Sequence, residues 1–284
     1  MNDPASYKNE ENSINIESSK SPLGGVGGLL HLADNALIMA QRNAEWCGHG
    51  PVLEQDIAIT NISLDLLGQS RNFYQYAAQL INDSKKSGGS KAPSPTGEGV
   101  GGEVTEDSLA YLRTERAFKN CLLAEQPNGD WAQTVLRQFF FSAYQFLLYK
   151  KLQDNTDEQI AAIAAKALKE VTYHLRWSSE WVVRLGDGTE ESHQRMLTAI
   201  DELWQYTGEL FVPAAYELES GFDVSSLKDD WFNKVTAVFE EATLPVPEKC
   251  FMQTGGKTGI HTEHLGFILA EMQYLQRTYP NAEW

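Results

Sequence analysis

A heptad pattern runs through residues 157–185, and it limits the possible folds more than any other feature of the chain. Apolar or small side chains recur there every three or four positions, at Ile160, Ala164, Ala167, Val171, His174, Ser178, Trp181 and Leu185. This spacing draws one continuous seam along a long helix, which other helices must cover. A chain with such a helix is expected to fold as a helical bundle.

Helical periodicity covers most of the remaining sequence as well. It predicts helices over residues 29–47, 52–81, 106–123, 130–153, 189–207, 229–243 and 260–278. Gly186 and Gly188 are expected to end the 157–185 helix, and Thr189 can cap the next one. No convincing strand or internal repeat is present. The sequence therefore predicts an all-α fold, an antiparallel bundle of four long helices with additional C-terminal helices.

Two segments lack this periodicity. Residues 1–28 are polar and then rich in glycine, and we expect a disordered N-terminal extension there. Residues 82–104 are dominated by Gly, Ser, Pro and Lys, which indicates a flexible loop and not a domain boundary. The expected organisation is one helical domain over residues 29–284.

The composition excludes several classes of protein. A formal net charge of −16 argues against nucleic-acid binding, which needs clustered Lys and Arg, and disfavours adsorption to anionic membranes. No run of 18 apolar residues is present, so no membrane span is expected, and the N-terminus has no apolar core of a signal peptide. Three widely spaced cysteines indicate reduced thiols and a cytoplasmic location.

Helical bundles can hold a di-iron site, and we therefore compared the sequence with that template. The template needs a Glu from each of two helices and a Glu-x-x-His from each of the other two. The chain has one Glu-x-x-His, Glu190 to His193, in the first turn of a predicted helix. Acidic residues in a first turn complement the helix dipole, so we interpret this motif as structural.

The predicted mid-bundle positions also match the template poorly. Three residues after Asp65, where the template needs a His, the chain has Gly68. Three residues after Glu170 it has Tyr173, and His174 follows one position later. The 130–153 helix offers only the neutral side chains Gln138, Ser142 and Gln145, which are poor ligands for iron. We therefore expect no metal on this chain, and a buried, hydrogen-bonded His174. The candidates for a degenerate metal site are Glu45, Asp65, Glu170 and His174.

Four stretches of the sequence resemble a known family, the structural C subunits of bacterial phenylacetyl-CoA epoxidases. They are "LADNALIMAQRNAEWCGHGPVLEQDIAITNISLDLLGQSR", "EQPNGDWAQTVLRQFFFSAYQ", "AAIAAKALKEVTYHLRWSSEWVVRLGDGTEESHQRM" and "GGKTGIHTEHLGFILAEMQYLQRTYP". The resemblance covers nearly all of residues 29–284. It departs from the family in the N-terminal extension and in the 82–104 stretch, which is longer than the usual loop.

The resemblance implies a ferritin-like bundle and a non-catalytic subunit. In this family the di-iron site lies on a related catalytic subunit. That subunit also makes the main contacts with phenylacetyl-CoA. The complex uses dioxygen and NADPH-derived electrons, delivered by a separate reductase, to convert the aromatic ring to a 1,2-epoxide in phenylacetate catabolism. The expected partners are thus the catalytic subunit and, through it, the reductase and the other subunits. No cofactor is expected on this chain.

Two regions are candidates for contact with a partner or with CoA. The stretch "GGKTGIHTEHLGF" places Lys257, His261 and His264 at a helix start, where free amides favour an anion, although capping and a partner contact are the simpler interpretation. Trp177 lies among Trp and Arg residues at helical spacing, a composition typical of interface cores.

Two other hypotheses remain open at this point. One is a di-iron oxygenase in its own right, with Asp65, Glu170, His174 and an acid of the first helix converging on metal. The other is a helical scaffold protein unrelated to oxygen chemistry.

Overall fold

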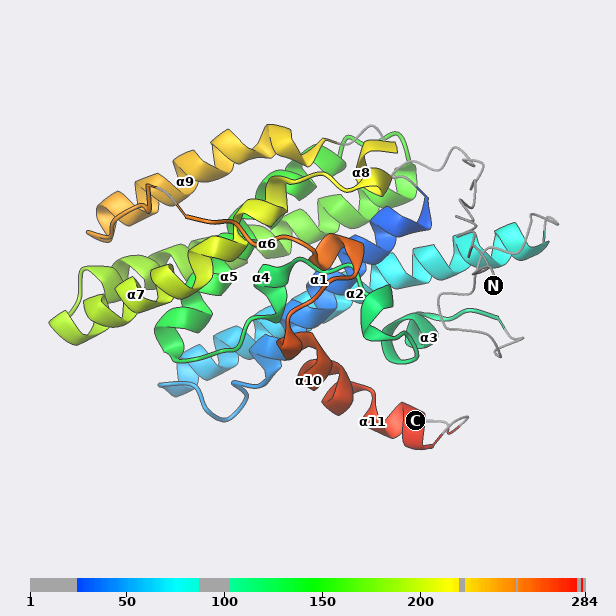
Figure 1. The fold of residues 1–284 in the computed structure, drawn as a ribbon, viewed down its shortest axis with the longest axis horizontal. Helices are drawn as coiled ribbons and strands as arrows, with labels where there is room; N and C mark the ends of the chain where they lie inside the picture. Colours follow the sequence, from blue (N-terminus) through cyan, green and yellow to red (C-terminus); the bar gives the residue numbers. More distant parts are fainter. Residues whose placement is uncertain (1–24, 87–102, 220–222, 249, 280–281, 283–284) are drawn as a thin grey trace, which may run out of the picture.

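Four long helices form the centre of the molecule. The computed structural model describes residues 25–86, 103–219, 223–248, 250–279 and 282. The four helices are α1 (Val26–Ala44), α2 (Leu53–Lys86), α5 (Trp131–Leu152) and α6 (Glu158–Gly186). Short connections join α1 to α2 and α5 to α6, so each of these pairs runs antiparallel (Figure 1). The prediction of an all-α, ferritin-like antiparallel bundle is confirmed.

Hydrogen bonds between α2 and α6 show that this pair is antiparallel too. Near the start of α2, Gln55 accepts a bond from the indole of Trp177, close to the end of α6. Further along α2, Gln69 donates to Glu170, nearer the start of α6. Residue numbers therefore increase along α2 in the direction in which they decrease along α6, as in an antiparallel pair.

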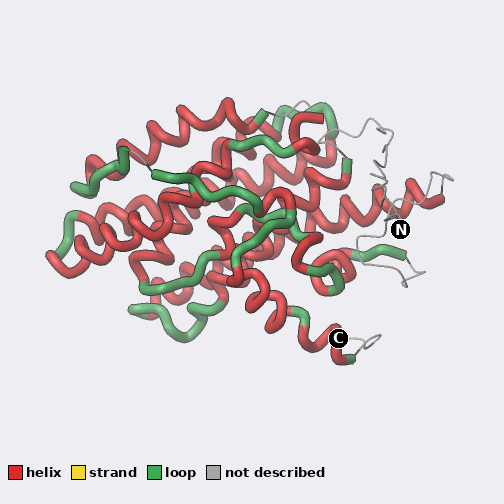
Figure 2. Tube along the Cα trace, in the orientation of Figure 1, coloured by secondary structure: helices red, strands yellow, loops and turns green. Residues whose placement is uncertain are grey.

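Shorter helices surround this bundle. They are α3 (Glu106–Tyr111), α4 (Leu122–Glu125), α7 (Glu190–Leu203), α8 (Ala215–Glu219), α9 (Lys228–Glu241), α10 (Glu263–Met272) and α11 (Tyr274–Thr278). Helices and loops account for the described part of the chain, which contains no strand (Figure 2). The hydroxyl of Thr189 accepts a bond from the amide of Ser192 and caps α7, as predicted. Helices α10 and α11 extend away from the bundle (Figure 1).

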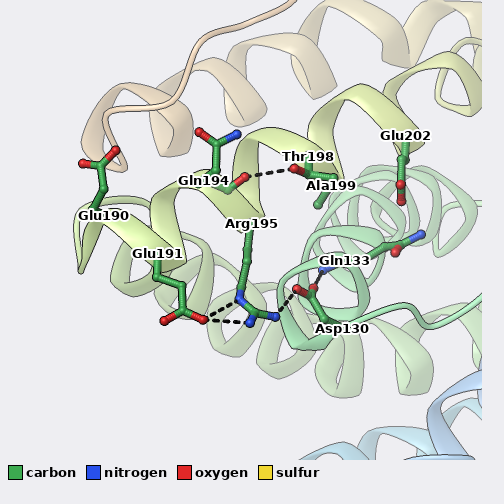
Figure 3. A pocket seen from close by; sticks show the side chains of 9 residues that line it. All are labelled: Asp130, Gln133, Glu190, Glu191, Gln194, Arg195, Thr198, Ala199 and Glu202. Carbon is green, nitrogen blue, oxygen red and sulfur yellow. Dashed lines mark hydrogen bonds and ion pairs between the residues drawn. The ribbon is translucent and has the colours of Figure 1, made fainter.

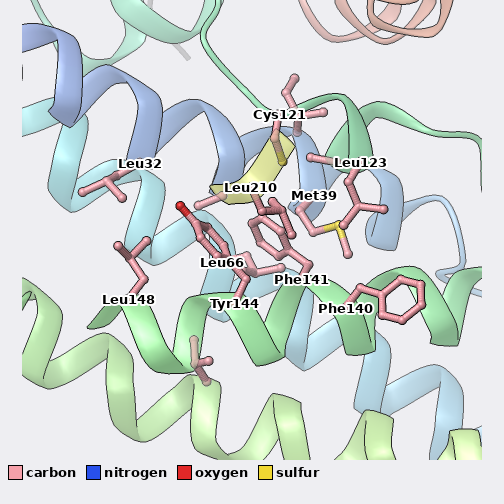
Figure 4. Close-up of a cluster of buried hydrophobic side chains, with 14 of the residues drawn as sticks. Leu32, Met39, Leu66, Cys121, Leu123, Phe140, Phe141, Tyr144, Leu148 and Leu210 are labelled. Atoms are coloured by element: carbon pink, nitrogen blue, oxygen red, sulfur yellow. The ribbon is translucent and has the colours of Figure 1, made fainter. Parts of the chain in front are cut away.

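The core is densest around α5, which is buried on nearly every side. Phe139, Phe140 and Phe141 are all fully buried, and Tyr144 follows one turn later (Figure 4). Trp231 of α9 donates its indole N–H to the carbonyl of Phe140 at 3.0 Å. Three consecutive buried aromatic rings require partners on several sides, because successive helical positions point about 100° apart. The α5 helix is therefore enclosed by neighbours that include α6, α7 and α9.

The predicted helix over residues 106–123 is wrong. The chain forms α3, then a short 3₁₀ turn at Glu115–Ala117, then α4, with extended backbone between them. The local sequence favours a helix, but side chains of α1 bond to this segment's backbone: Asp34 accepts from the amide of Lys119 and Asn35 from that of Cys121. Tertiary hydrogen bonds thus replace the intrahelical ones.

Two helices extend beyond their predicted ranges. The α1 helix begins at Val26 and not at residue 29, and Gly27 allows Tyr216 to approach it closely, since a Cβ there would lie 3.0 Å from the Cβ of Tyr216. The α2 helix continues to Lys86 and not to 81, and Asn82 within it exchanges two hydrogen bonds with the backbone of Val104. The rest of the expected disordered extension (1–24) and of the expected flexible loop (87–102) lies outside the described residues.

No described helix combines the length and the apolar character needed to cross a bilayer.

Candidate functional site

Three of the four degenerate-site candidates, Asp65, Glu170 and His174, lie on the neighbouring helices α2 and α6. The imidazole Nε2 of His174 lies 3.0 Å from Oδ2 of Asp65. One turn further along the seam, the amide of Gln69 donates to Glu170 at 3.0 Å. The His174 side chain is fully buried, whereas that of Asp65 is 38% exposed. The pair is therefore a hydrogen bond at the edge of the bundle, with one partner in the core and the other near solvent.

The interior between α1 and α5 is held by neutral side chains. Asn43 donates its amide to Oε1 of Gln138 at 2.7 Å, and Gln138 donates its own amide to the hydroxyl of Ser142 at 2.7 Å. All three residues are fully buried. These side chains bond to one another and carry no formal charge, and the Oδ1 atom of Asn43 has no hydrogen-bond partner among the described residues. This is the part of a four-helix bundle where metal-binding carboxylates and imidazoles project.

Glu45, the fourth candidate, lies elsewhere. Its carboxylate accepts bonds from Arg42 at 3.0 Å and from Asn128 at 2.8 Å, at the end of α1. Asp34, the other acid of α1, is neutralised by Arg113, which donates to both of its carboxylate oxygens. Neither acid therefore contributes a carboxylate beside Asp65, Glu170 or His174.

These residues do not fit a di-iron centre. Such a centre needs six Glu and His ligands that converge from four helices. Within the described ranges, no three His, Cys, Asp or Glu side chains come close enough to hold a metal ion. Amide and hydroxyl groups occupy the interior of α1 and α5, and iron binds these groups poorly. The independent di-iron oxygenase hypothesis finds no ligand set in this arrangement.

The Glu190–His193 motif serves the junction of α6 and α7. The Nδ1 atom of His193 lies 2.6 Å from the carbonyl of Gly186, the last residue of α6. Glu190 borders a surface pocket of about 780 Å³ between α5 and α7 (Figure 3). Arg195 crosses this pocket and bonds Asp130 at 2.9 Å and Glu191 at 2.7 Å. The motif therefore closes a helix junction, as the sequence indicated.

The structure places Lys257 inside the protein and not at a site for an anion. Its ammonium group donates to Glu217 of α8 at 3.1 Å and to the carbonyl of Val212 at 3.1 Å. Only 4% of the Lys257 side chain and 6% of the Glu217 side chain are exposed. The charge of Lys257 is thus used within this chain, and its contact with a partner or CoA stays a prediction.

His261 is likewise committed to internal contacts. Its Nδ1 lies 2.9 Å from Glu125 and its Nε2 lies 3.1 Å from the carbonyl of Phe118, so both ring nitrogens face acceptors. Burial disfavours the imidazolium, but the hydrogen bond and charge of Glu125 and the Phe118 carbonyl outweigh it and raise the pKa of His261. An imidazolium that donates from both nitrogens has no lone pair for a metal.

Trp177, the candidate contact on α6, is buried within this chain. Its ring packs edge-on against that of Trp131, with 6.0 Å between the ring centres. Gln55 of α2 accepts its indole N–H at 3.0 Å and that of Trp181 at 2.8 Å. The N-terminal turns of α2 cover this position. His264, by contrast, is half-buried on the first turn of α10.

Sequence reasoning missed a buried charged cluster, which we define by seven residues: Asp34, Arg113, Glu125, Glu209, Glu217, Lys257 and His261. Arg113 and Asp34 are both fully buried, and the phenol of Tyr74 donates to the same carboxylate. Glu209 accepts the backbone amides of Leu122 and Gly255, each at 2.7 Å. Burial raises the pKa of Glu209, and these amides oppose that rise. The cluster fixes irregular backbone against α1.

Comparison with known proteins identifies relatives of the whole chain. A family model described as "Phenylacetic acid catabolic protein" matches residues 16–284. The chain is 48% identical over 260 residues to the C subunit of the 1,2-phenylacetyl-CoA epoxidase of Escherichia coli (strain K12). This alignment covers 90% of the chain and 97% of the relative.

Proposed function

The chain belongs to the family of phenylacetic acid catabolic proteins, and from this premise we propose that it is the non-catalytic structural subunit of a phenylacetyl-CoA 1,2-epoxidase. In this role it pairs with a catalytic subunit that carries di-iron, and it stabilises that subunit during aerobic phenylacetate catabolism. The phenylacetyl-CoA is bound mainly by the partner. The reductase and the remaining subunits are linked to this chain through the catalytic subunit.

One observation carries the non-catalytic part of the proposal. Where a di-iron subunit needs carboxylates and imidazoles, α1 and α5 place the hydrogen-bonded series Asn43, Gln138 and Ser142. The acids of α1 and its C-terminal end are neutralised by arginines, Asp34 by Arg113 and Glu45 by Arg42. The bundle thus has the shape of a di-iron protein and an interior suited to packing alone.

Elemental analysis of iron tests this proposal. The full chain is expressed in iron-rich medium and purified alone, and the catalytic subunit is prepared in the same way as a positive control. We expect near-zero iron in a folded helical chain, and iron in the control. About two irons per chain would overturn the proposal and favour an independent di-iron oxygenase.

Reconstitution tests the structural role. The catalytic subunit and the reductase are assayed for epoxidation of phenylacetyl-CoA with and without this chain, and copurification of the chain with the catalytic subunit is measured. We expect a stable complex and a higher or longer-lived activity when the chain is present. Absence of both binding and effect would favour the unrelated scaffold hypothesis.

A further inference from the structure

A row of large aliphatic side chains on α2 faces solvent. Four members are exposed: Leu53 by 72%, Ile57 by 51%, Leu64 by 60% and Leu67 by 45%. The opposite face of the same helix packs on α1, with Ile59, Ile62 and Leu66 fully buried. Isolated exposed aliphatic residues are common on protein surfaces, but several in one row mark an interaction site. We call these four residues the outer α2 row.

The spacing of the outer α2 row is that of a helix-packing seam. Its members and the intervening Thr60 follow one another at intervals of four, three, four and three residues. That alternation is the a/d pattern of a heptad, in which each side chain inserts between four side chains of a facing helix. The row spans two heptads, about 21 Å at 1.5 Å per residue. Its natural complement is therefore another α-helix that runs along α2.

The charges beside the row define that complement further. Between residues 53 and 70 the helix carries three acids, Glu54, Asp56 and Asp65, and no Lys or Arg. The next charge is Arg71, which lies 3.6 Å from Glu106 of α3. A helix that docks here is thus favoured when Lys or Arg borders its apolar seam. A second copy of the same row would bring acids against acids, since Glu54 and Asp65 would face their equivalents.

The C-terminal end of the outer α2 row leaves room for another helix to approach α2 closely. Gly68 follows Leu67 directly, and a Cβ built on it would meet no atom within 4 Å. On the neighbouring helix, Tyr173 is 39% exposed and precedes His174, whose ring reaches Asp65 beside Leu64. An exposed aromatic side chain of α6 is thus adjacent in sequence to the residue that contacts α2 beside Leu64.

We propose that the outer α2 row is the docking seam for an amphipathic helix of the catalytic subunit, a helix with an a/d apolar seam bordered by Lys or Arg. This inference rests on the proposed function, because it names the surface through which the two subunits pair. The row lies on the opposite side of α2 from α1, so docking leaves the fold of this chain unchanged.

The test compares two charge substitutions at equally exposed positions. Leu64→Glu places a carboxylate within the row, where the native side chain is 60% exposed, and Phe267→Glu places one on α10, where the native side chain is 68% exposed. The full chain and both variants are titrated with the purified catalytic subunit, and Kd is measured by calorimetry. We expect Leu64→Glu to weaken binding by about 30-fold or more, as for a residue at an interface centre, and Phe267→Glu to change it by less than about 3-fold. Circular dichroism and thermal unfolding should show the same fold in all three proteins.

A second measurement locates the contact without any substitution. Hydrogen–deuterium exchange is followed in the wild-type chain with and without the catalytic subunit. We expect slower exchange over residues 53–71 of the complex, since a bound helix restricts the opening of α2. Unchanged exchange over these residues in a formed complex would overturn the docking seam.

The outcomes separate this inference from the proposed function. If the wild-type chain does not bind the catalytic subunit, the proposed function fails. If the wild-type chain binds and Leu64→Glu binds equally well, the docking seam fails and the proposed function stands. If the wild-type chain self-associates and Leu64→Glu abolishes only that association, the row joins two copies of the chain, and the proposal is overturned.

Discussion

Two buried polar regions of this protein differ in how they are neutralised. Between α1 and α5, Asn43, Gln138 and Ser142 bond to one another without any formal charge. On the other side of α1, the buried charged cluster pairs Asp34 with Arg113, Glu217 with Lys257, and Glu125 with His261. The first region lies where helix packs on helix, and the second lies where irregular backbone packs on a helix.

The difference follows from the backbone groups that each region must satisfy. Residues in helices bond their amides and carbonyls to one another, so neutral side chains suffice at a helix–helix contact. The segments near residues 113–122 and 255–262 lack continuous helical bonds, and Glu209 accepts the amides of Leu122, Gly255 and Lys257 from them. The Lys257 side chain in turn donates to the carbonyls of Leu210 and Val212. In this protein the buried charges therefore anchor loops, and the neutral interior between α1 and α5 needs none.

Breaking the Arg113–Asp34 pair should give the largest effect. Arg113→Met removes the guanidinium that bonds both carboxylate oxygens of Asp34, and it strands a carboxylate in the core. We expect the free energy of unfolding to fall by about 3–5 kcal/mol, the cost of leaving one buried charge unpaired. Urea denaturation measures it, with Arg116→Met, an exposed neighbour, as the matched control. A loss below about 1 kcal/mol would show that the cluster does not hold the loops.

The neutral region should be less sensitive. Gln138→Leu removes the acceptor of Asn43 and the donor to Ser142, but it strands no charge. We expect a loss of about 1–3 kcal/mol, the cost of buried polar groups without partners. The same urea denaturation measures it. A loss as large as that of Arg113→Met would remove the distinction between the two regions.

The smallest effect should be the pH dependence of the His261–Glu125 pair. The pKa of His261 is raised in the folded protein, so the folded chain binds this proton more tightly than the unfolded chain does. The stabilisation is fully present below the unfolded pKa of about 6.5 and is lost as the pH rises through the folded pKa. We therefore expect His261→Gln to destabilise the protein more at a pH of about 5.5 than at about 9. An equal loss at both values would mean that folding does not raise the pKa of His261.

The sequence predicted the elements that local periodicity encodes. The four long helices and the cap at Thr189 were found because their spacing and capping residues are local. The 106–123 helix failed because Asp34 and Asn35, about 85 residues away, bond to backbone amides that a helix would have used. No local pattern reports such a bond.

The candidate site was predictable to a similar degree. Helical spacing predicted that Glu170 and His174 lie within about one turn, but their contacts with Gln69 and Asp65 join α6 to α2 and are not encoded locally. The partners of Glu45 and Trp177, Asn128 and Gln55, likewise belong to other elements. The charged cluster was missed for the same reason, since Glu125 and His261 lie 136 positions apart.

The charged cluster also sets the order in which the chain can be completed during synthesis. Glu125 pairs with His261 and Glu217 pairs with Lys257, so α4 and α8 complete these contacts only after residues 257–261 have been made. Long-range contacts of this kind slow folding, and a nascent chain that exposes them is prone to aggregate. The helix pair α1–α2 can form early on the ribosome, whereas the loops that cover α1 close last.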